Sequence, residues 1–182
     1  MLITQQAGDL KNIFLEGGVF AYPTEAVYGL GCDPDNETAV LRLLALKQRP
    51  ISKGLILVAS DFSQVQKYLK PLSDKQLALT KPSATSYIYP ALNSAPKWLT
   101  GDFNSLAIRV SKHPLVRELC ETLGSAVVSS SANISGQAPA KTADEVLAQF
   151  EKKIDIILEG KLGDANKPSI IRDSISGQIF RK

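Results

Sequence analysis

The segment from Ala21 to Leu57 constrains the fold and function of this chain more than any other segment. It reads as a short apolar strand, a Pro-Thr-Glu turn, a glycine-rich loop, a capped helix, a basic cluster and a second apolar strand. Polar and cationic groups therefore gather at the ends of apolar strands, which is where open α/β sheets bind their ligands. We interpret the segment as one wall of a pocket for an anionic small molecule.

The start of this segment predicts a strand that ends in polar groups. The strand is expected over Val19–Tyr22, because Pro23 cannot donate to a sheet ladder. Thr24 and Glu25 follow at its end. The glycines of the run 28–31 (Tyr-Gly-Leu-Gly) indicate a loop with close backbone approach or positive φ.

A basic cluster, Lys47, Arg49 and Lys53, follows the helix expected over 37–48. Cations near a helix C-terminus contribute about 0.3–1 kcal/mol to stability, so both a structural role and phosphate binding are open for this trio. The immediate return into the strand Leu55–Ala59 favours phosphate binding, because it would bring the trio back beside Thr24.

A second polar stretch covers 129–136 (Ser-Ser-Ser-Ala-Asn-Ile-Ser-Gly) and follows an apolar strand. It is either a polar turn or a cradle for phosphate or nucleotide.

The alternating strand Ser105–Val110 carries Arg109 on the face of Ser105 and Ala107. Arg109 is either a binding residue or a solvated charge on the sheet.

The remaining pattern predicts an α/β fold, a twisted mixed sheet flanked by helices, because some strands follow one another without an intervening helix. No linker or repeat divides the chain, so we expect one domain over 1–182. Trp98 is expected to be buried in an otherwise irregular segment, 90–101. Further helices are predicted over 5–16, 62–69, 74–80, 114–123 and 142–150, and further strands over 87–89, 126–128, 154–158, 169–172 and 178–181.

Composition excludes several classes of function. The chain has one histidine, His113, and two distant cysteines, Cys32 and Cys120, which rules out zinc sites of the usual spacing. No Gly-x-Ser-x-Gly elbow accompanies the histidine, so a Ser-His-Asp hydrolase is disfavoured. No apolar run reaches the roughly 20 residues needed to cross a bilayer. Without a signal-peptide pattern either, we expect a cytoplasmic protein with no membrane partner and with reduced, buried thiols.

Taken in order, these motifs resemble the YrdC-like family of threonylcarbamoyl-AMP synthases. The resemblance spans nearly the whole chain and is specific as an ordered set. It rests on Tyr22-Pro23-Thr24-Glu25, Tyr28-Gly29-Leu30-Gly31, Lys47-Gln48-Arg49-Pro50, Arg109, the 129–136 stretch, Pro168-Ser169 and Phe180-Arg181.

The resemblance implies a nucleotidyltransferase with a concave, positively charged cavity. Its substrates would be L-threonine, bicarbonate and ATP, with Mg²⁺ accompanying ATP and no tightly bound cofactor or protein-held metal. The product would be L-threonylcarbamoyladenylate, passed to downstream proteins that modify ANN-decoding tRNAs. By position, the resemblance implies catalytic contacts to the phosphates from Lys47 and Arg49, ATP contacts from Lys53, Ser129, Ser131, Asn133 and Arg181, and contacts to threonine, carboxylate or phosphate from Thr24, Tyr28, Arg109 and Ser169.

The sequence departs from the family pattern in the loop Lys81–Ser86, where relatives usually carry a Trp-Pro-Gly-Pro run ending in threonine. Ser86 keeps a hydroxyl at the threonine position and is the remaining candidate for ligand contact there. Ala26 and Lys53 also stand where many relatives have threonine and asparagine. These differences could move threonine contacts to other residues.

Two alternatives to an active synthase stay open from the sequence. One is a module that binds tRNA or ribosomal RNA without chemistry of its own, although aromatic residues do not interleave with the basic ones as stacking would require. Direct contact with tRNA or double-stranded RNA is also open for an active enzyme, because the two readings are not exclusive. The other is a weakened enzyme with a retained binding role, suggested by the altered 81–86 loop.

Overall fold

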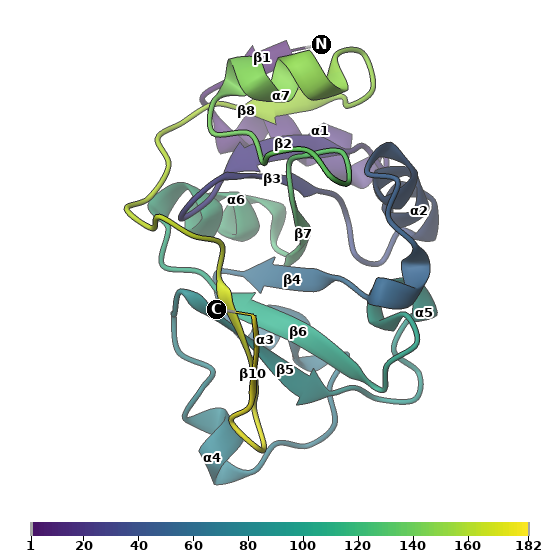
Figure 1. The fold of residues 1–182 in the computed structure, drawn as a ribbon, viewed down its shortest axis with the longest axis vertical. Helices are drawn as coiled ribbons and strands as arrows, with labels where there is room; N and C mark the ends of the chain where they lie inside the picture. The colour runs from purple at the N-terminus through teal and green to yellow at the C-terminus, as the bar shows by residue number, and fades with distance from the viewer. Residues whose placement is uncertain (1, 182) are drawn as a thin grey trace.

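The chain folds around a mixed β-sheet with helices on both faces (Figure 1). The structure is a computed structural model, and it describes residues 2–181. The strands are β1 (Leu2–Thr4), β2 (Phe20–Pro23), β3 (Tyr28–Gly31), β4 (Ile56–Ala59), β5 (Thr85–Pro90), β6 (Ser105–Val110), β7 (Val127–Ser131), β8 (Ile156–Leu158), β9 (Ile170–Asp173) and β10 (Ile179–Arg181). The helices are α1 (Leu10–Leu15), α2 (Glu37–Leu46), α3 (Ser63–Gln66), α4 (Asp74–Leu77), α5 (Lys97–Thr100), α6 (Pro114–Leu123) and α7 (Ala143–Phe150), with 3-10 turns η1 (Ala7–Asp9) and η2 (Ile51–Lys53).

Strand β7 joins the two halves of the sheet. Over the described residues the strand order is β1-β8-β2-β3-β7-β4-β6-β5-β9-β10. The end of β7, Ser130 and Ser131, pairs antiparallel with β3, whereas Val127–Ser129 pairs antiparallel with β4. The pairs β4–β6, β5–β9, β2–β8 and β1–β8 are parallel, which confirms the predicted mixed sheet.

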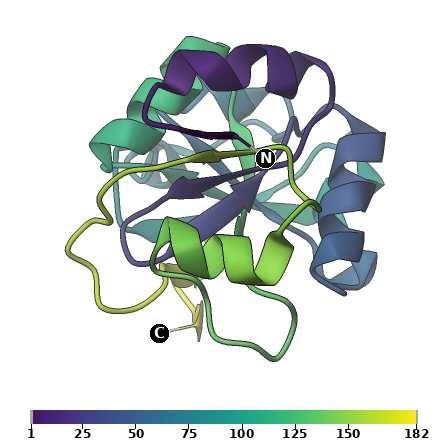
Figure 2. The ribbon, with the colours of Figure 1, turned by 90° about the horizontal axis from the view of Figure 1, so that it is seen from above.

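Apolar side chains form a core on each face of the sheet. On one face, α1 and α6 pack on Phe20 and Tyr22 of β2. On the other, α2 and α7 pack against Leu30 of β3 and Leu57 of β4. Figure 2 shows α1 and α6 on the side of the sheet opposite α7. Each such Leu or Phe contributes about 1.5–3 kcal/mol when fully buried, so the two cores stabilise the sheet from both faces.

Several predicted helix ends are confirmed. The Asn36 side chain accepts a hydrogen bond from the backbone N–H of Ala39 at the start of α2. Ser73 and Gln76 form a reciprocal capping box on α4. Pro114 opens α6, and Gly124 ends it in the left-handed conformation. These are local hydrogen-bonding and steric preferences, which is why sequence alone predicts them.

The N-terminal prediction was partly wrong. The helix expected over 5–16 is a 3-10 turn followed by the shorter α1, and the unpredicted strand β1 precedes both. Strand β1 pairs with β8, more than 150 residues later, and such a pairing leaves no local sequence pattern. In the part of the chain that the structure describes, no helix is long and apolar enough to cross a membrane.

The glycine-rich loop predicted at 28–31 is also wrong, because these residues form β3, a hairpin with β2. The glycines serve close approach instead of positive φ. A Cβ on Gly31 would lie 2.8 Å from the Phe20 ring and 3.0 Å from the Val128 carbonyl oxygen. Glycine therefore lets the β2 aromatic rings pack across β3.

Tertiary pairing also lengthens or shortens other predicted elements. Strand β5 begins at Thr85 and so includes part of the predicted 81–86 loop, because β6 and β9 pair with its two sides. Within the segment expected to be irregular, α5 forms a single turn. Trp98 on α5 is partly buried against the core, and its indole N–H donates to the Pro34 carbonyl at 3.0 Å.

The two cysteines are buried free thiols, as predicted. Burial raises the pKa of Cys120 to about 12, and the neighbouring Glu121 carboxylate adds to the shift. Its thiol donates to the Val58 carbonyl. Cys120 therefore acts as a small apolar side chain between α6 and the sheet.

We predict that Gly31→Ala lowers the free energy of unfolding by about 1–3 kcal/mol, because the added methyl overpacks β2 and β7. Urea denaturation measures the effect. Gly8→Ala is the matched control, since a Cβ on Gly8 meets nothing within 4 Å. Equal stability of the two variants would contradict the tight packing described for β3.

Candidate functional site

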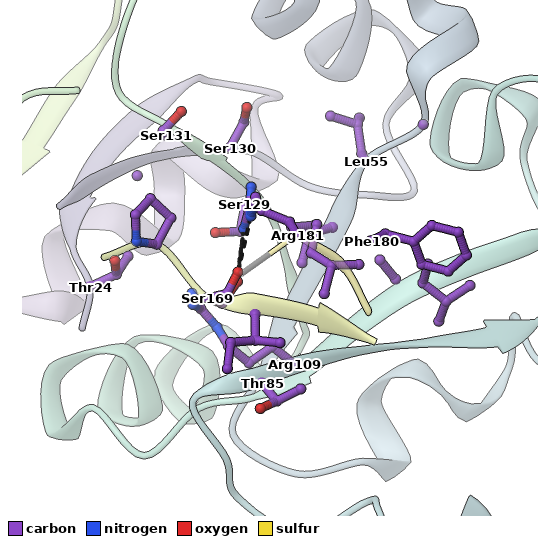
Figure 3. Close-up of a pocket in the computed structure, with 18 of the residues that line it drawn as sticks. Thr24, Leu55, Thr85, Arg109, Ser129, Ser130, Ser131, Ser169, Phe180 and Arg181 are labelled. Carbon is purple, nitrogen blue, oxygen red and sulfur yellow. Dashed lines mark hydrogen bonds between the residues drawn. The ribbon is translucent and has the colours of Figure 1, made fainter. Parts of the chain in front are cut away.

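A cavity of about 800 Å³ lies where the two halves of the sheet meet (Figure 3). Its walls come from the ends of β3 and β7, from β4, β5 and β6, and from the C-terminal hairpin β9–β10. The turn 24–27, the segment 49–55 and the loop 165–169 complete it. Segments far apart in the sequence therefore line one cavity. This agrees with the interpretation of the 21–57 segment as one wall of a pocket.

Cationic side chains outnumber carboxylates among the described residues that line the cavity. Three arginines, Arg49, Arg109 and Arg181, come from three different parts of the chain. Desolvation, and then the charges of Arg109 and Arg49, lower the pKa of Arg181, so the three guanidinium groups lie within electrostatic range of one another. The remaining charged lining residues are Lys53, Lys167, Glu25 and Asp173.

Thr24 and Glu25 occupy the tight turn of the β2–β3 hairpin. Both the backbone N–H and the hydroxyl of Thr24 donate to the Val27 carbonyl, at 3.1 and 2.7 Å. The loop after β8 is tied to this turn, because the N–H groups of Gly163 and Ala165 donate to the carbonyls of Thr24 and Glu25. The backbone beneath these two side chains is thus held from both sides.

Arg109 is buried, so the alternative of a solvated charge on the sheet is wrong. Its Nη1 lies 3.2 Å from Glu25 Oε2, and the two side chains are 8% and 13% exposed. Glu25 Oε1 also accepts a hydrogen bond from the Ser111 hydroxyl at 2.6 Å. Burial follows from topology, because β4 and β5 flank β6 and the β2–β3 turn supplies the carboxylate.

Arg49 and Lys53 line the cavity together, as predicted from their return toward Thr24. Arg49 Nη2 donates to the Gly54 carbonyl at 2.9 Å, and its Nε is buried without a hydrogen-bond partner. Desolvation lowers the pKa of Arg49. Its guanidinium is therefore anchored at one edge and has a free donor at another.

Lys47, in contrast, lies behind the cavity wall and is not among its lining residues. Its ammonium group donates to the backbone carbonyls of Ser131 and Asn133, the latter at 2.8 Å. Desolvation, together with the charge of Arg49, lowers the pKa of Lys47 to about 8. Lys47 thus holds the end of β7 in place through these two backbone carbonyls.

Asn133 also lies outside the lining, next to Ser131, which does line the cavity together with Ser129. The Ser131 hydroxyl donates to Asn133 Oδ1 at 2.6 Å, and the Asn133 amide donates to the carbonyls of Ile134 and Gln137. Direct contacts of Lys47 and Asn133 with a nucleotide stay predictions.

The C-terminal hairpin brings Ser169 and Arg181 to the opposite wall. Arg181 Nη2 donates to the Ser169 carbonyl at 2.8 Å and to its hydroxyl at 3.0 Å, as Figure 3 shows. Ser86 is fully buried and its hydroxyl lies 2.9 Å from that of Ser169, so Ser86 supports Ser169 while its neighbour Thr85 lines the cavity. Tyr28 also lines the cavity, with its hydroxyl bonded to the Gly160 carbonyl at 3.2 Å.

A model of the Sua5/YciO/YrdC family, described as telomere recombination, matches residues 12–182. The chain belongs to the Sua5/YciO/YrdC family. Threonylcarbamoyl-AMP synthase of Enterobacter sp. (strain 638) is 52% identical, over 99% of this chain and 95% of that protein. The protein of the same name from Klebsiella pneumoniae is 51% identical, over 90% and 88% of the two chains.

Solved structures of Sua5/YciO/YrdC proteins have the same fold. P. abyssi Sua5 complexed with L-threonine has a TM-score of 0.87 at 28% identity, over 94% of this chain and 53% of that one. The H234A/Y235A variant of P. abyssi Sua5 gives 0.90 at 27% identity, over 98% and 57%. This chain thus spans a little over half of Sua5. E. coli YciO, at 24% identity and a TM-score of 0.81 over 100% and 93%, shows likeness of fold alone.

Within this family fold, several lining residues were not recognised as site candidates from the sequence, among them Thr85, Phe103, Asn166 and Lys167. Lys167 stands two residues before Ser169, so the Pro-Ser motif could have indicated it. Phe103 lies in a turn after α5, and no local pattern marked it as a site residue. Glu25 was noted at a strand end, but its partner Arg109 becomes visible only in the folded sheet.

Lys47→Met should give a stability difference from wild type that depends on pH. The pKa of Lys47 is about 8 in the folded chain, against about 10.4 when unfolded. Between these values the unfolded chain holds more protons, so the stability of the wild type rises with pH by up to about 1.4 kcal/mol per pH unit from this group. The variant lacks that gain.

Urea denaturation of both proteins at pH 7, 8 and 9 measures this difference. Lys75→Met, on α4 outside the cavity lining, is the control, and its stability difference from wild type should stay constant with pH. A constant difference for Lys47→Met as well would contradict the buried, desolvated ammonium.

Proposed function

We propose that this cavity is the active site in which the chain makes L-threonylcarbamoyladenylate and pyrophosphate from L-threonine, bicarbonate and ATP. The single observation that carries the proposal is the meeting of Arg49, Arg109 and Arg181 in one cavity, beside the serines at the end of β7. The synthase names of the curated relatives and the threonine complex of Sua5 support it.

This chemistry requires positioning and charge neutralisation more than a protein nucleophile. The amine of threonine and bicarbonate give a carbamate and water, and a carbamate oxygen then attacks the α-phosphorus of ATP and displaces pyrophosphate. Both partners are anions, and more negative charge develops as pyrophosphate leaves. Preorganised guanidinium groups in a partly desolvated cavity stabilise such charge, and holding the reactants together removes much of the entropic cost.

We assign the two ends of the cavity to the two substrates. Arg49, Lys53 and Arg181, with Ser129 and Ser131, would bind ATP, and Mg²⁺ would accompany the phosphates, held largely by them and by water. Thr24, Tyr28, Arg109 and Ser169 would surround threonine. Ser86 would act through Ser169.

For Lys47 and Asn133 we propose a role through β7. They set the position of Ser131 in the described geometry, and a direct phosphate contact would require the Lys47 ammonium to leave the carbonyls it now binds. The product would pass to proteins that modify ANN-decoding tRNAs in the cytoplasm.

Pyrophosphate release by the purified protein tests the proposal. We expect release only when ATP, threonine and bicarbonate are all present, because the carbamate must form before the adenylate can. Mass spectrometry should detect the adenylate in the same mixture and lose it when any substrate is omitted. Release without threonine, or salt-sensitive RNA binding without any release, would overturn the proposal, the latter in favour of the RNA-binding module.

Arg49→Ala should lower turnover by about 10²-fold or more, as removal of other charge-stabilising donors does. The measurement is steady-state pyrophosphate release at saturating substrates. Arg117→Ala is the matched control, since Arg117 pairs with Glu121 on α6 outside the cavity lining. Similar turnover of the two variants, both folded by circular dichroism, would contradict the role of Arg49.

A further inference from the structure

The loop that carries Arg49 and Lys53 has little hold on the apolar core. It runs from the end of α2 to the start of β4 and contains the 3-10 turn η2, in which none of the three described residues is buried. Burial of apolar side chains is the main force that fixes a segment in place. The position of this loop therefore depends on another contact, and Figure 1 shows α5 beside it.

Two glycines form the contact between the loop and α5. Gly54 follows η2 with φ +58°, and Gly101 follows α5 with φ +61°. A Cβ on Gly101 would lie 2.5 Å from the Ser52 carbonyl oxygen and 2.7 Å from the Gly54 nitrogen. A Cβ on Gly54 would lie 3.0 Å from the Thr100 carbonyl oxygen. The atoms in the way belong to the backbone, so no side-chain rotation relieves the overlap and only glycine allows this approach.

Backbone hydrogen bonds fix the glycine contact on both sides. The N–H of Asp102 donates to the Ser52 carbonyl at 3.2 Å, and the N–H of Leu55 donates to the Leu99 carbonyl at 2.9 Å. Leu99 is fully buried, so α5 is anchored in the core while η2 stays at the surface. A larger residue at Gly101 would therefore displace the loop more than the helix.

The same loop sets the place of two cations of the cavity. Arg49 Nη2 donates to the Gly54 carbonyl at 2.9 Å, so its guanidinium is held by one of the two glycines. Lys53 directly precedes that glycine. Arg49 and Lys53 line the cavity, whereas Gly101 is not among the described residues that line it. The positions of both cations are thus tied to a residue outside the cavity.

We propose that Gly101 is a positioning residue for ATP binding, because its contact with Gly54 sets where Arg49 and Lys53 stand in the cavity. That these cations bind ATP rests on the proposed function. Gly101 acts only through the loop, and a small displacement is enough. A misplacement of about 1 Å, caused by a change away from the reacting groups, can cost about 10²-fold in rate.

Steady-state pyrophosphate release by Gly101→Ala tests the proposal. The KM for ATP should rise about tenfold or more, because the added methyl displaces Arg49 and Lys53. The KM for threonine should stay within about twofold of wild type, since Thr24 and Arg109 lie on other segments. Partial unfolding alone would lower the apparent kcat and leave both KM values unchanged.

Gly124→Ala is the matched control. Gly124 also follows a helix with a positive φ, +68°, but a Cβ there would meet no described atom within 4 Å. This variant carries a similar backbone strain without a clash, so both KM values should stay at the wild-type level. Equal KM values for ATP in Gly101→Ala and Gly124→Ala would overturn the proposal. Gly54→Ala, with the longer contact of 3.0 Å, should show the same ATP-specific rise and decides if Gly101→Ala does not fold.

Calorimetric titration with ATP and Mg²⁺ separates failure of this inference from failure of the proposed function. Threonine-dependent pyrophosphate release by wild type, with equal ATP affinity in Gly101→Ala and Gly124→Ala, rejects the inference alone. No such release, with weaker ATP binding by Gly101→Ala than by Gly124→Ala, rejects the synthase and keeps the positioning role. A wild-type protein that binds no ATP rejects both.

Discussion

The pairing of β7 with two different strands is the constraint on which the site depends. Its first residues pair with β4 and its last two with β3, so one strand joins the halves of the sheet. Ser129 and Ser131 consequently stand at the junction, with the β2–β3 turn on one side and β6 on the other. Lys47 secures this arrangement, because its ammonium group binds the carbonyls that end the strand.

Buried charge gives the cavity its chemical character. Taking charged side chains out of water is costly, and the folded chain offsets the cost in different ways. Arg49 donates to the Gly54 carbonyl, Arg181 to Ser169, and Arg109 faces Glu25. Among the described residues, five buried side-chain atoms are left unsatisfied, and three of them, Arg49 Nε, Arg109 Nε and Glu25 Oε2, belong to residues that line the cavity. Buried polar atoms without partners lower the stability of the fold, and these three atoms do so at residues of the cavity wall.

Local features of the site and fold were predictable from the sequence. The caps at Asn36 and Ser73 and the proline that opens α6 act within a few residues of themselves. The alternation separated Ser105, Ala107 and Arg109 from Leu106 and Ile108, and the structure confirms these two faces of β6. It left open whether Arg109 faces solvent or a ligand, and only the structure shows that the first face lines the cavity and the second lies in the core. The ordered motifs were sufficient to indicate the family. Ser129, Ser131, Arg49 and Arg181 were named from them and line one cavity.

The sequence alone determined which residue types stand at strand ends and which faces are apolar, because these properties repeat with the period of the backbone. Only the tertiary structure decided which polar groups face the cavity and which support it. Lys47 binds the end of β7 and Ser86 faces Ser169 through contacts that span more than 80 residues, whereas Asn133 accepts from Ser131, two residues away. Glu25 and Arg109 became a pair for the same reason. A side chain's partner depends on strand order and register, which long-range packing sets and no local pattern encodes.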